Sequence, residues 1–266
     1  MRVATTRSLQ EARCRSDRHR ASARQGAQRG DQRLRVGGTA GEPVVARGDQ
    51  GPGVGEQRPA GVGHGEACDA GVRALVHLSG ADAAEHSPLP WAHAIWQIDE
   101  QVRASGLAYT LVRPSGFMTN LESSAPAIRR GFLPQAMGRG VIPWIDTADI
   151  ARVAAHVLHG ATHDGAEHLV TGPELLDGRG VARSLSAGLD RTVRYVHLPS
   201  RAFAGLLRAN GVPAWQAEGL RQQFGRVARH GLDGIDVQTD EVERLTGRPA
   251  RALADWARSR RATLLG

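Results

Sequence analysis

The fold of this chain is decided by the stretch Ala104-Ser-Gly-Leu-Ala-Tyr-Thr-Leu-Val-Arg-Pro-Ser-Gly-Phe-Met-Thr-Asn-Leu121. A helix with an apolar face is predicted just before it, over residues 91–104. Ser105-Gly106 is a normal helix stop, and the apolar run at 109–113, closed by Pro114, predicts a buried strand. Helix, glycine and strand at this spacing are typical of the βαβ units of an open parallel sheet.

The flanking sequence continues this pattern. Apolar runs predict strands at 72–78, 141–145, 167–171 and 192–198. Periodicity predicts helices at 150–158, 180–189, 200–209, 214–230, 239–246 and 250–261. We expect Asp146 and Asp149 to cap the first of these helices, and Thr239 or Asp240 to cap the one at 239–246. The chain is therefore predicted to be α/β from 67 to about 198, with a smaller, mostly helical lobe from about 199.

The composition excludes several classes of protein. All 34 basic residues are arginine, which rules out a lysine Schiff base, a Walker A lysine and a Tyr-x-x-x-Lys dyad. Cys14 and Cys68 make neither a disulfide framework nor a zinc site. The sequence has no apolar run near the ~20 residues of a membrane span and no signal-peptide core. We therefore expect a cytoplasmic protein that is not embedded in a membrane.

Residues 1–66 differ from the rest of the chain. They hold 12 arginines against 7 acidic residues, which is +5 of the formal +7, and all eleven aromatic residues lie at or after Trp91. Only nine Leu, Val, Met, Ile and Phe residues occur there, too few to offset the chain entropy lost on folding. We expect this segment to be disordered or mistranslated. An arginine arm of this kind can bind nucleic acid, but it has no aromatic residues for base stacking, so we do not expect nucleic acid as a partner.

Six segments together resemble the NmrA-like family of atypical short-chain dehydrogenases. They are Gly71-Val-Arg-Ala-Leu-Val-His-Leu-Ser79, the 104–121 stretch, Asp146-Thr-Ala-Asp-Ile-Ala151, His168-Leu-Val-Thr-Gly-Pro-Glu174, Arg191-Thr-Val-Arg-Tyr-Val196 and Thr239-Asp-Glu-Val-Glu-Arg-Leu-Thr-Gly-Arg-Pro249. The resemblance covers residues 67–266 and is most specific in Ser-Gly-Leu-x-Tyr-Thr-x-x-Arg-Pro. It implies a Rossmann-like parallel sheet that binds NAD(P), with NADP slightly favoured.

The resemblance also implies a function. Relatives of this family are NAD(P)H-dependent oxidoreductases that act on quinone-like or other small acceptors, so a small-molecule substrate and a monomer or homodimer are expected. Two alternatives stay open: a non-catalytic NAD(P)-binding redox sensor, and a remnant with a defective cofactor site. Hydride transfer to a quinone needs chiefly a stacked cofactor and acceptor, so the missing Tyr/Lys dyad does not exclude an enzyme. The catalytic residues stay unassigned.

One part of the family pattern is missing. Relatives begin with a strand and a Gly-x-x-Gly-x-x-Gly turn that seats the pyrophosphate at a helix N-terminus. Residues 1–66 contain no such turn, and their glycine-dense runs follow no recognisable strand. The N-terminal portion of the sheet is therefore predicted to be incomplete or replaced. Our hypothesis is that 1–66 is a frame-shifted or mis-started translation of a GC-rich gene.

The candidate cofactor residues follow two predicted strands. Ligands of open α/β sheets bind at the carboxyl ends of the strands. By resemblance, these positions lie beside the nicotinamide and its ribose: Leu78, Ser79, Gly80, Arg113, Pro114, Ser115, Gly116 and Phe117. A simple strand-ending turn is the alternative for Ser79 and Gly80.

The candidate substrate residues are His93, Met118, Asn120 and Trp144. Core packing is the alternative for Phe117, Met118 and Trp144, and a surface helix position is the alternative for His93. No metal is expected, because the histidines around residues 156–168 have no cysteine or carboxylate to complete a zinc site.

Overall fold

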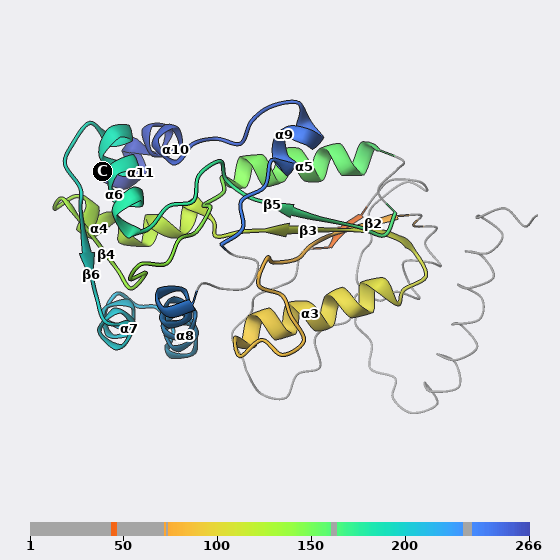
Figure 1. Ribbon diagram of the computed structural model, residues 1–266, viewed down its shortest axis with the longest axis horizontal. Coiled ribbons are helices and arrows are strands. Elements are labelled where there is room, and N and C mark those ends of the chain that lie inside the picture. The colour runs from red at the N-terminus through yellow and green to blue at the C-terminus, as the bar shows by residue number, and fades with distance from the viewer. Residues whose placement is uncertain (1–43, 47–71, 73, 161–163, 231–235) are drawn as a thin grey trace, which may run out of the picture.

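A central parallel sheet forms the middle layer of the molecule (Figure 1). The structure is a computed structural model that describes residues 44–46, 72, 74–160, 164–230 and 236–266. The strands of this sheet run in the order β1-β2-β3-β5, and every neighbouring pair is parallel. They are β1 (Val44–Ala46), β2 (Ala74–Leu78), β3 (Ala108–Pro114) and β5 (Ala166–Val170). This confirms the predicted α/β fold with its parallel sheet.

A helix covers each face of the sheet: α3 (Pro90–Arg103) on one side and α5 (Thr147–His159) on the other (Figure 1). Successive residues of a strand point to opposite faces. In β2, Leu75 packs in a cluster with Val102 of α3, whereas Val76 packs in a cluster with residues of α5. Because both faces are buried, these strands appear in the sequence as continuous apolar runs.

The mostly helical lobe lies at the carboxyl ends of the strands, where β3 and β5 point in Figure 1. A second, two-stranded parallel sheet belongs to it. Its elements are η1 (Met118–Ser124), α4 (Ala125–Ile128), β4 (Phe132–Gln135), α6 (Gly178–Leu189), β6 (Arg194–His197), α7 (Ser200–Ala209), α8 (Ala214–His230), α10 (Leu253–Ser259) and α11 (Arg261–Leu265). They share one core, in which Leu133, Leu185 and Trp256 are fully buried. The lobe thus also includes residues 118–135 and 178–197, which precede its predicted start near residue 199 in the sequence.

Two strand predictions are corrected. The segment 141–145 is not a strand: it makes only isolated bridges at Ile142 and Ile145, and Pro143 between them has no N–H to donate to a ladder. The strand predicted at 192–198 exists as β6, but it pairs with β4, which sequence reasoning missed, and not with the central sheet.

The cap predicted at Asp146 is confirmed, whereas those predicted at Asp149 and at Thr239 or Asp240 are wrong. Asp149 lies inside the first turn of α5, where its Oδ2 accepts from the backbone N–H of Arg251 at 2.7 Å. The Asp146 side chain accepts a hydrogen bond from the backbone N–H of Ala148 at the start of α5. α9 (Glu241–Thr246) begins after Asp240, but its cap has no side-chain hydrogen bond. The Thr239 hydroxyl instead donates to the carbonyl of Leu169 at 2.7 Å, and so fastens the segment before α9 to β5.

The strand β1 lies inside the segment that was expected not to fold. Its residues Val44–Ala46 pair in parallel with β2, directly ahead of the glycine-dense sequence. Sequence reasoning missed this strand. The remainder of 1–66, with Cys14, and Cys68 beyond it lie outside the described residues. Among the helices that the structure describes, none has the length and apolar character needed to cross a membrane.

Candidate functional site

The predicted cofactor residues gather at one edge of the central sheet, because β2 and β3 are parallel neighbours. We call residues 79–83, which follow β2, the β2 corner. Its backbone continues the pairing with β3: Ser79 N–H donates to the carbonyl of Val112 at 2.8 Å, and Ala81 N–H donates to that of Pro114 at 3.0 Å. Open α/β sheets bind ligands at this edge.

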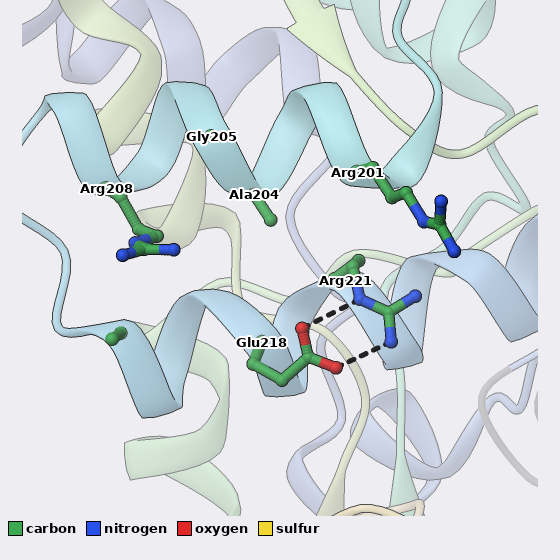
Figure 2. A pocket seen from close by; sticks show the side chains of 7 residues that line it. Arg201, Ala204, Gly205, Arg208, Glu218 and Arg221 are labelled. Carbon is green, nitrogen blue, oxygen red and sulfur yellow. Dashed lines mark hydrogen bonds and ion pairs between the residues drawn. The ribbon is translucent and has the colours of Figure 1, made fainter.

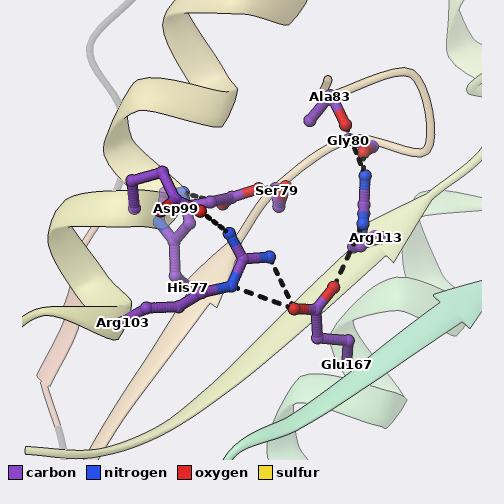
Figure 3. Close-up of polar contacts among 9 residues, drawn as sticks. His77, Ser79, Gly80, Ala83, Asp99, Arg103, Arg113 and Glu167 are labelled. Carbon is purple, nitrogen blue, oxygen red and sulfur yellow. Dashed lines mark hydrogen bonds and ion pairs between the residues drawn. The ribbon is translucent and has the colours of Figure 1, made fainter. Parts of the chain in front are cut away.

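The Arg113 side chain holds the β2 corner in place (Figure 3). Its Nε donates to the carbonyl of Gly80 at 3.2 Å, and one terminal nitrogen donates to the carbonyl of Ala83 at 2.6 Å. The other terminal nitrogen bonds Glu167 Oε2 of β5 at 3.1 Å. The guanidinium is therefore bonded to the protein itself, so Arg113 acts on this edge by positioning the corner.

Glu167 links this guanidinium to a second one. Arg103, at the end of α3, bonds Glu167 Oε1 through two nitrogens at 3.1 and 2.5 Å. Burial alone would raise the pKa of Glu167, but the hydrogen bonds from Arg103 and Arg113 hold it below its ordinary value. Glu167 is thus a carboxylate at neutral pH, and it ties α3, β3 and β5 together.

A buried polar group lies beneath the corner. The Ser79 hydroxyl donates to Asp99 Oδ2 of α3 at 2.7 Å, and Asp99 Oδ1 lies 3.4 Å from His77 Nε2 (Figure 3). Asp99 is 1% exposed and His77 is 3% exposed. Burial raises the pKa of Asp99, which the Ser79 hydrogen bond partly offsets, and burial lowers the pKa of His77.

These two residues were missed by sequence reasoning, although a signal was present. His77 interrupts the apolar run of β2. Asp99 stands on α3 four residues after Ile95 and three before Val102, which puts a carboxylate on the apolar face of the helix. A charged residue on a face that must be buried needs a partner inside the protein.

The residues after β3 are fixed by the segment that follows Val141. The Ser115 hydroxyl donates to the carbonyl of Pro143 at 2.5 Å, and Ile145 N–H donates to that of Gly116 at 2.9 Å. A Cβ atom at Gly116 would meet Ile142 at 3.0 Å and the Trp144 ring at 3.4 Å. Glycine here allows this close packing.

The predicted substrate residues are spread over several environments. Met118 is fully buried in the lobe core and Trp144 is 3% exposed, whereas Asn120 is exposed. The His93 ring bonds the carbonyl of Glu85 at 2.7 Å through Nδ1 and the Gln97 side-chain amide at 3.0 Å through Nε2. Both ring nitrogens of His93 are therefore engaged locally.

α8 of the lobe packs against the β2 corner and the start of α3. The Gln223 amide reaches Asp82 Oδ2 at 3.4 Å, and Gly219 approaches Trp91 so closely that an added Cβ would lie 1.9 Å from its ring. Burial raises the pKa of Asp82, against the opposing effects of nearby hydrogen bonds and Arg113. The lobe and the sheet edge thus meet at the corner.

Two open cavities lie away from this edge. The first, about 360 Å³, runs between α7 and α8 and is lined by Arg201, Arg208, Arg221 and Glu218 (Figure 2). Arg221 bonds both carboxylate oxygens of Glu218, at 2.8 and 2.6 Å. Hydrogen bonds from Arg221 and Gln222 lower the pKa of the exposed Glu218 to about 2. The second cavity, about 650 Å³, lies where the start of α5 meets residues 248–252. Neither is lined by the predicted cofactor residues.

Two of the histidines considered as metal ligands, His156 and His159, lie in the last turn of α5. His168 is bonded through Nδ1 to Glu241 Oε1 at 2.5 Å, and His163 lies outside the described residues. Within the described ranges, no group of three or more His, Cys, Asp or Glu residues is placed to hold a metal ion.

The chain is similar to several known proteins. Residues 67–253 match the model of the NmrA-like family. NAD(P)H azoreductase of Xenophilus azovorans is 36% identical over 191 residues, which are 71% of this chain and 66% of that protein. A (4-alkanoyl-5-oxo-2,5-dihydrofuran-3-yl)methyl phosphate reductase of Streptomyces griseus is 37% identical over 193 residues, covering 72% of this chain and 67% of that protein.

A solved structure shows the same likeness. The NADPH-dependent quinone oxidoreductase of Escherichia coli in complex with NADPH superposes with a TM-score of 0.65 at 28% identity, over 73% of this chain and 68% of that one. The matches therefore span about two-thirds of the length of these relatives.

Proposed function

This chain belongs to the NmrA-like family, and on that premise we propose that it is an NAD(P)H-dependent oxidoreductase that reduces a small acceptor of the quinone or azo type. The relatives named azoreductase, quinone oxidoreductase and reductase support this activity. NADPH is the first cofactor to test, because the quinone oxidoreductase structure holds it. We further propose that the protein acts in the cytoplasm as a monomer or homodimer, without nucleic acid.

The edge formed by β2 and β3 fits the nicotinamide end of a dinucleotide. Leu78, the last residue of β2, is 41% exposed, while Leu75 and Val76 of the same strand are at most 5% exposed. An apolar side chain exposed at the end of a buried strand offers a wall for a planar ring. The single observation that carries the proposal is this exposed apolar edge beside a corner that is already fixed.

We assign a different role to each group of residues at this edge. Leu78, Ser79 and Gly80 would border the ribose and nicotinamide, with the backbone of residues 113–117 on the other side. Arg113 would keep the corner in the binding geometry. When bound, the dinucleotide supplies the hydride. The acceptor would enter from the lobe side, where His93, Met118, Asn120 and Trp144 stay our candidates for contact or for shaping the pocket.

Cofactor titration of the full chain tests this proposal. We expect NADPH or NADH to bind with micromolar affinity, measured by fluorescence of the reduced nicotinamide, and expect NADPH to be oxidised when a quinone or azo dye is added. Leu78→Asp should weaken cofactor binding by placing a charge at the wall, whereas Leu206→Asp on α7, at a leucine of similar exposure, should not. Absence of binding at millimolar cofactor would overturn the proposal, and binding without turnover would favour the sensor alternative.

A further inference from the structure

The His77–Asp99 pair gives the β2 corner a property that the hydride chemistry does not require. We propose that Asp99 is a positioning residue: its carboxylate holds the Ser79 hydroxyl, and uptake of a proton by the His77–Asp99 pair weakens this hold, so that cofactor affinity falls as the pH drops. The inference rests on the proposed function, because the corner held by Asp99 is the one assigned to the cofactor.

The geometry places the pair directly under the corner. His77 and Ser79 are two residues apart, so they share the face of β2 that α3 covers. Asp99 of α3 lies between them and uses one oxygen for each: Oδ2 accepts from Ser79 at 2.7 Å, and Oδ1 lies 3.4 Å from His77 Nε2. Ser79 is 6% exposed, and the other two residues are less exposed still. The β2 corner is thus held by the hydrogen bond from Ser79 to Asp99 of α3 and by the hydrogen bonds that Arg113 donates.

A neutral side chain would serve a purely structural role better. An ionised carboxylate in a low-dielectric interior is costly unless it is paired and hydrogen-bonded. Here Asp99 Oδ1 has no hydrogen bond, and neither do the two ring nitrogens of His77, within the part of the chain that the structure describes. Asparagine at 99 would still accept from Ser79 without the charge. The carboxylate therefore adds a response to protons, which an amide would lack.

The charges around the pair set the direction of this response. Burial raises the pKa of Asp99 above its ordinary 3.8 and lowers the pKa of His77 below its ordinary 6.5. Arg113 of β3 and Arg103 of α3 favour the Asp99 carboxylate, and Glu167 of β5 opposes it. The two shifts run toward each other. While Asp99 is ionised the Ser79 bond is charge-assisted, and charge-assisted bonds are the stronger ones, so a proton taken up on Asp99 weakens it.

Binding of NADP⁺, which is stable in acid, tests the inference. Affinity would be measured by calorimetry from pH 8 to pH 5 in the wild-type chain and in Asp99→Asn, Ser79→Ala and the remote control Glu218→Gln. We expect wild type to lose roughly tenfold in affinity across this range, the factor for weakening one charge-assisted bond. Glu218→Gln should follow wild type, since that carboxylate titrates near pH 2. Dividing the affinity of each variant by that of wild type at the same pH cancels the effect of the titration of NADP⁺ itself.

The outcomes separate the two proposals. The inference is supported if the affinity of Asp99→Asn, divided by that of wild type at the same pH, rises toward pH 5. The same ratio for Glu218→Gln should stay constant. Ser79→Ala, which deletes one oxygen atom, should bind more weakly at pH 8 and lose the acid dependence, and it serves as the second test if Asp99→Asn does not fold. If wild type binds but both variants keep its pH dependence, the inference is wrong and the proposed function stands. If wild type binds no NADP⁺ or NADPH at any pH, the proposed function fails.

Discussion

Replacing Arg113 by methionine tests the idea that this residue positions the β2 corner. Methionine keeps the apolar stem of the side chain and removes three hydrogen bonds: those to the carbonyls of Gly80 and Ala83, at 3.2 and 2.6 Å, and that to Glu167 at 3.1 Å. Glu167 is not stranded by this change, because Arg103 still bonds its other oxygen at 2.5 Å. The loss therefore falls on the two carbonyls of the corner.

The size of the effect follows from these contacts. A hydrogen bond from a charged donor contributes about 1.5–3 kcal/mol, less when the freed acceptor can be rehydrated. The two corner bonds then amount to about 2–4 kcal/mol, and the part-exposed pair with Glu167 adds at most about 0.5 kcal/mol after solvent screening. For a folded body of this size, 1 kcal/mol shifts the melting temperature by about 2–4 °C. We expect Arg113→Met to melt roughly 4–18 °C below wild type.

Arg103→Met is the matched control, since it removes the other guanidinium from the same Glu167. Among the residues that the structure describes, Arg103 bonds only the carboxylates of Glu100 and Glu167, at the protein surface, so its loss should cost no more than about 1 kcal/mol. Urea unfolding followed by circular dichroism gives both free energies of unfolding, and NADP⁺ titration gives the effect on the site. If Arg103→Met destabilises as much as Arg113→Met, or if Arg113→Met leaves NADP⁺ affinity unchanged, Arg113 does not position the corner.

Three further outcomes are expected. Gly172→Ala should cost more than about 3 kcal/mol in urea unfolding, because the new Cβ would lie 1.8 Å from the Trp144 carbonyl oxygen. Gly205→Ala should instead raise the free energy of unfolding in urea by up to about 1 kcal/mol, since nothing lies within 4 Å of its Cβ position in α7. The pKa of Glu241 is lowered mainly by its hydrogen bond from Arg244, so its contribution to stability is present above the ordinary pKa of 4.5 and fades as the pH falls. Glu241→Gln should therefore be less stable than wild type at pH 7, and the difference should shrink as the pH falls below 4.5; a difference that stays constant with pH would contradict this.

The central sheet could be predicted because its signals are local. The apolar run of β2, the stop at Gly106, whose φ of +75° favours glycine, and Pro114 at the end of β3 each act within a few residues. The pairing of β4 with β6 could not be predicted. β4 is four residues long, includes Pro134, and finds its partner some sixty residues later, and no local periodicity records such a pairing.

In the candidate site, the sequence predicted where several residues lie but not which contacts they make. Strand ends in the sequence located Ser79, Gly80 and Arg113 at one edge, as parallel topology requires. What Arg113 does there depends on Glu167, which comes from a strand later in the chain, and on a corner that curls back toward it. Asp99 becomes part of the site only when α3 packs on β2. Tertiary packing, and not spacing along the chain, determines these roles.

The all-arginine composition gains a specific meaning at this corner. Arg113 contacts two carbonyls of the β2 corner and one carboxylate of β5 at once. A planar guanidinium can make these bonds with its nitrogens in fixed directions, whereas a lysine ammonium is a single compact charge at the end of a flexible stem. The corner is therefore fixed by contacts that need no bound ligand. A site fixed in this way loses little ordering entropy when a ligand binds, so the absence of lysine, which excludes a Tyr/Lys dyad, is compatible with a preorganised cofactor edge built on arginine.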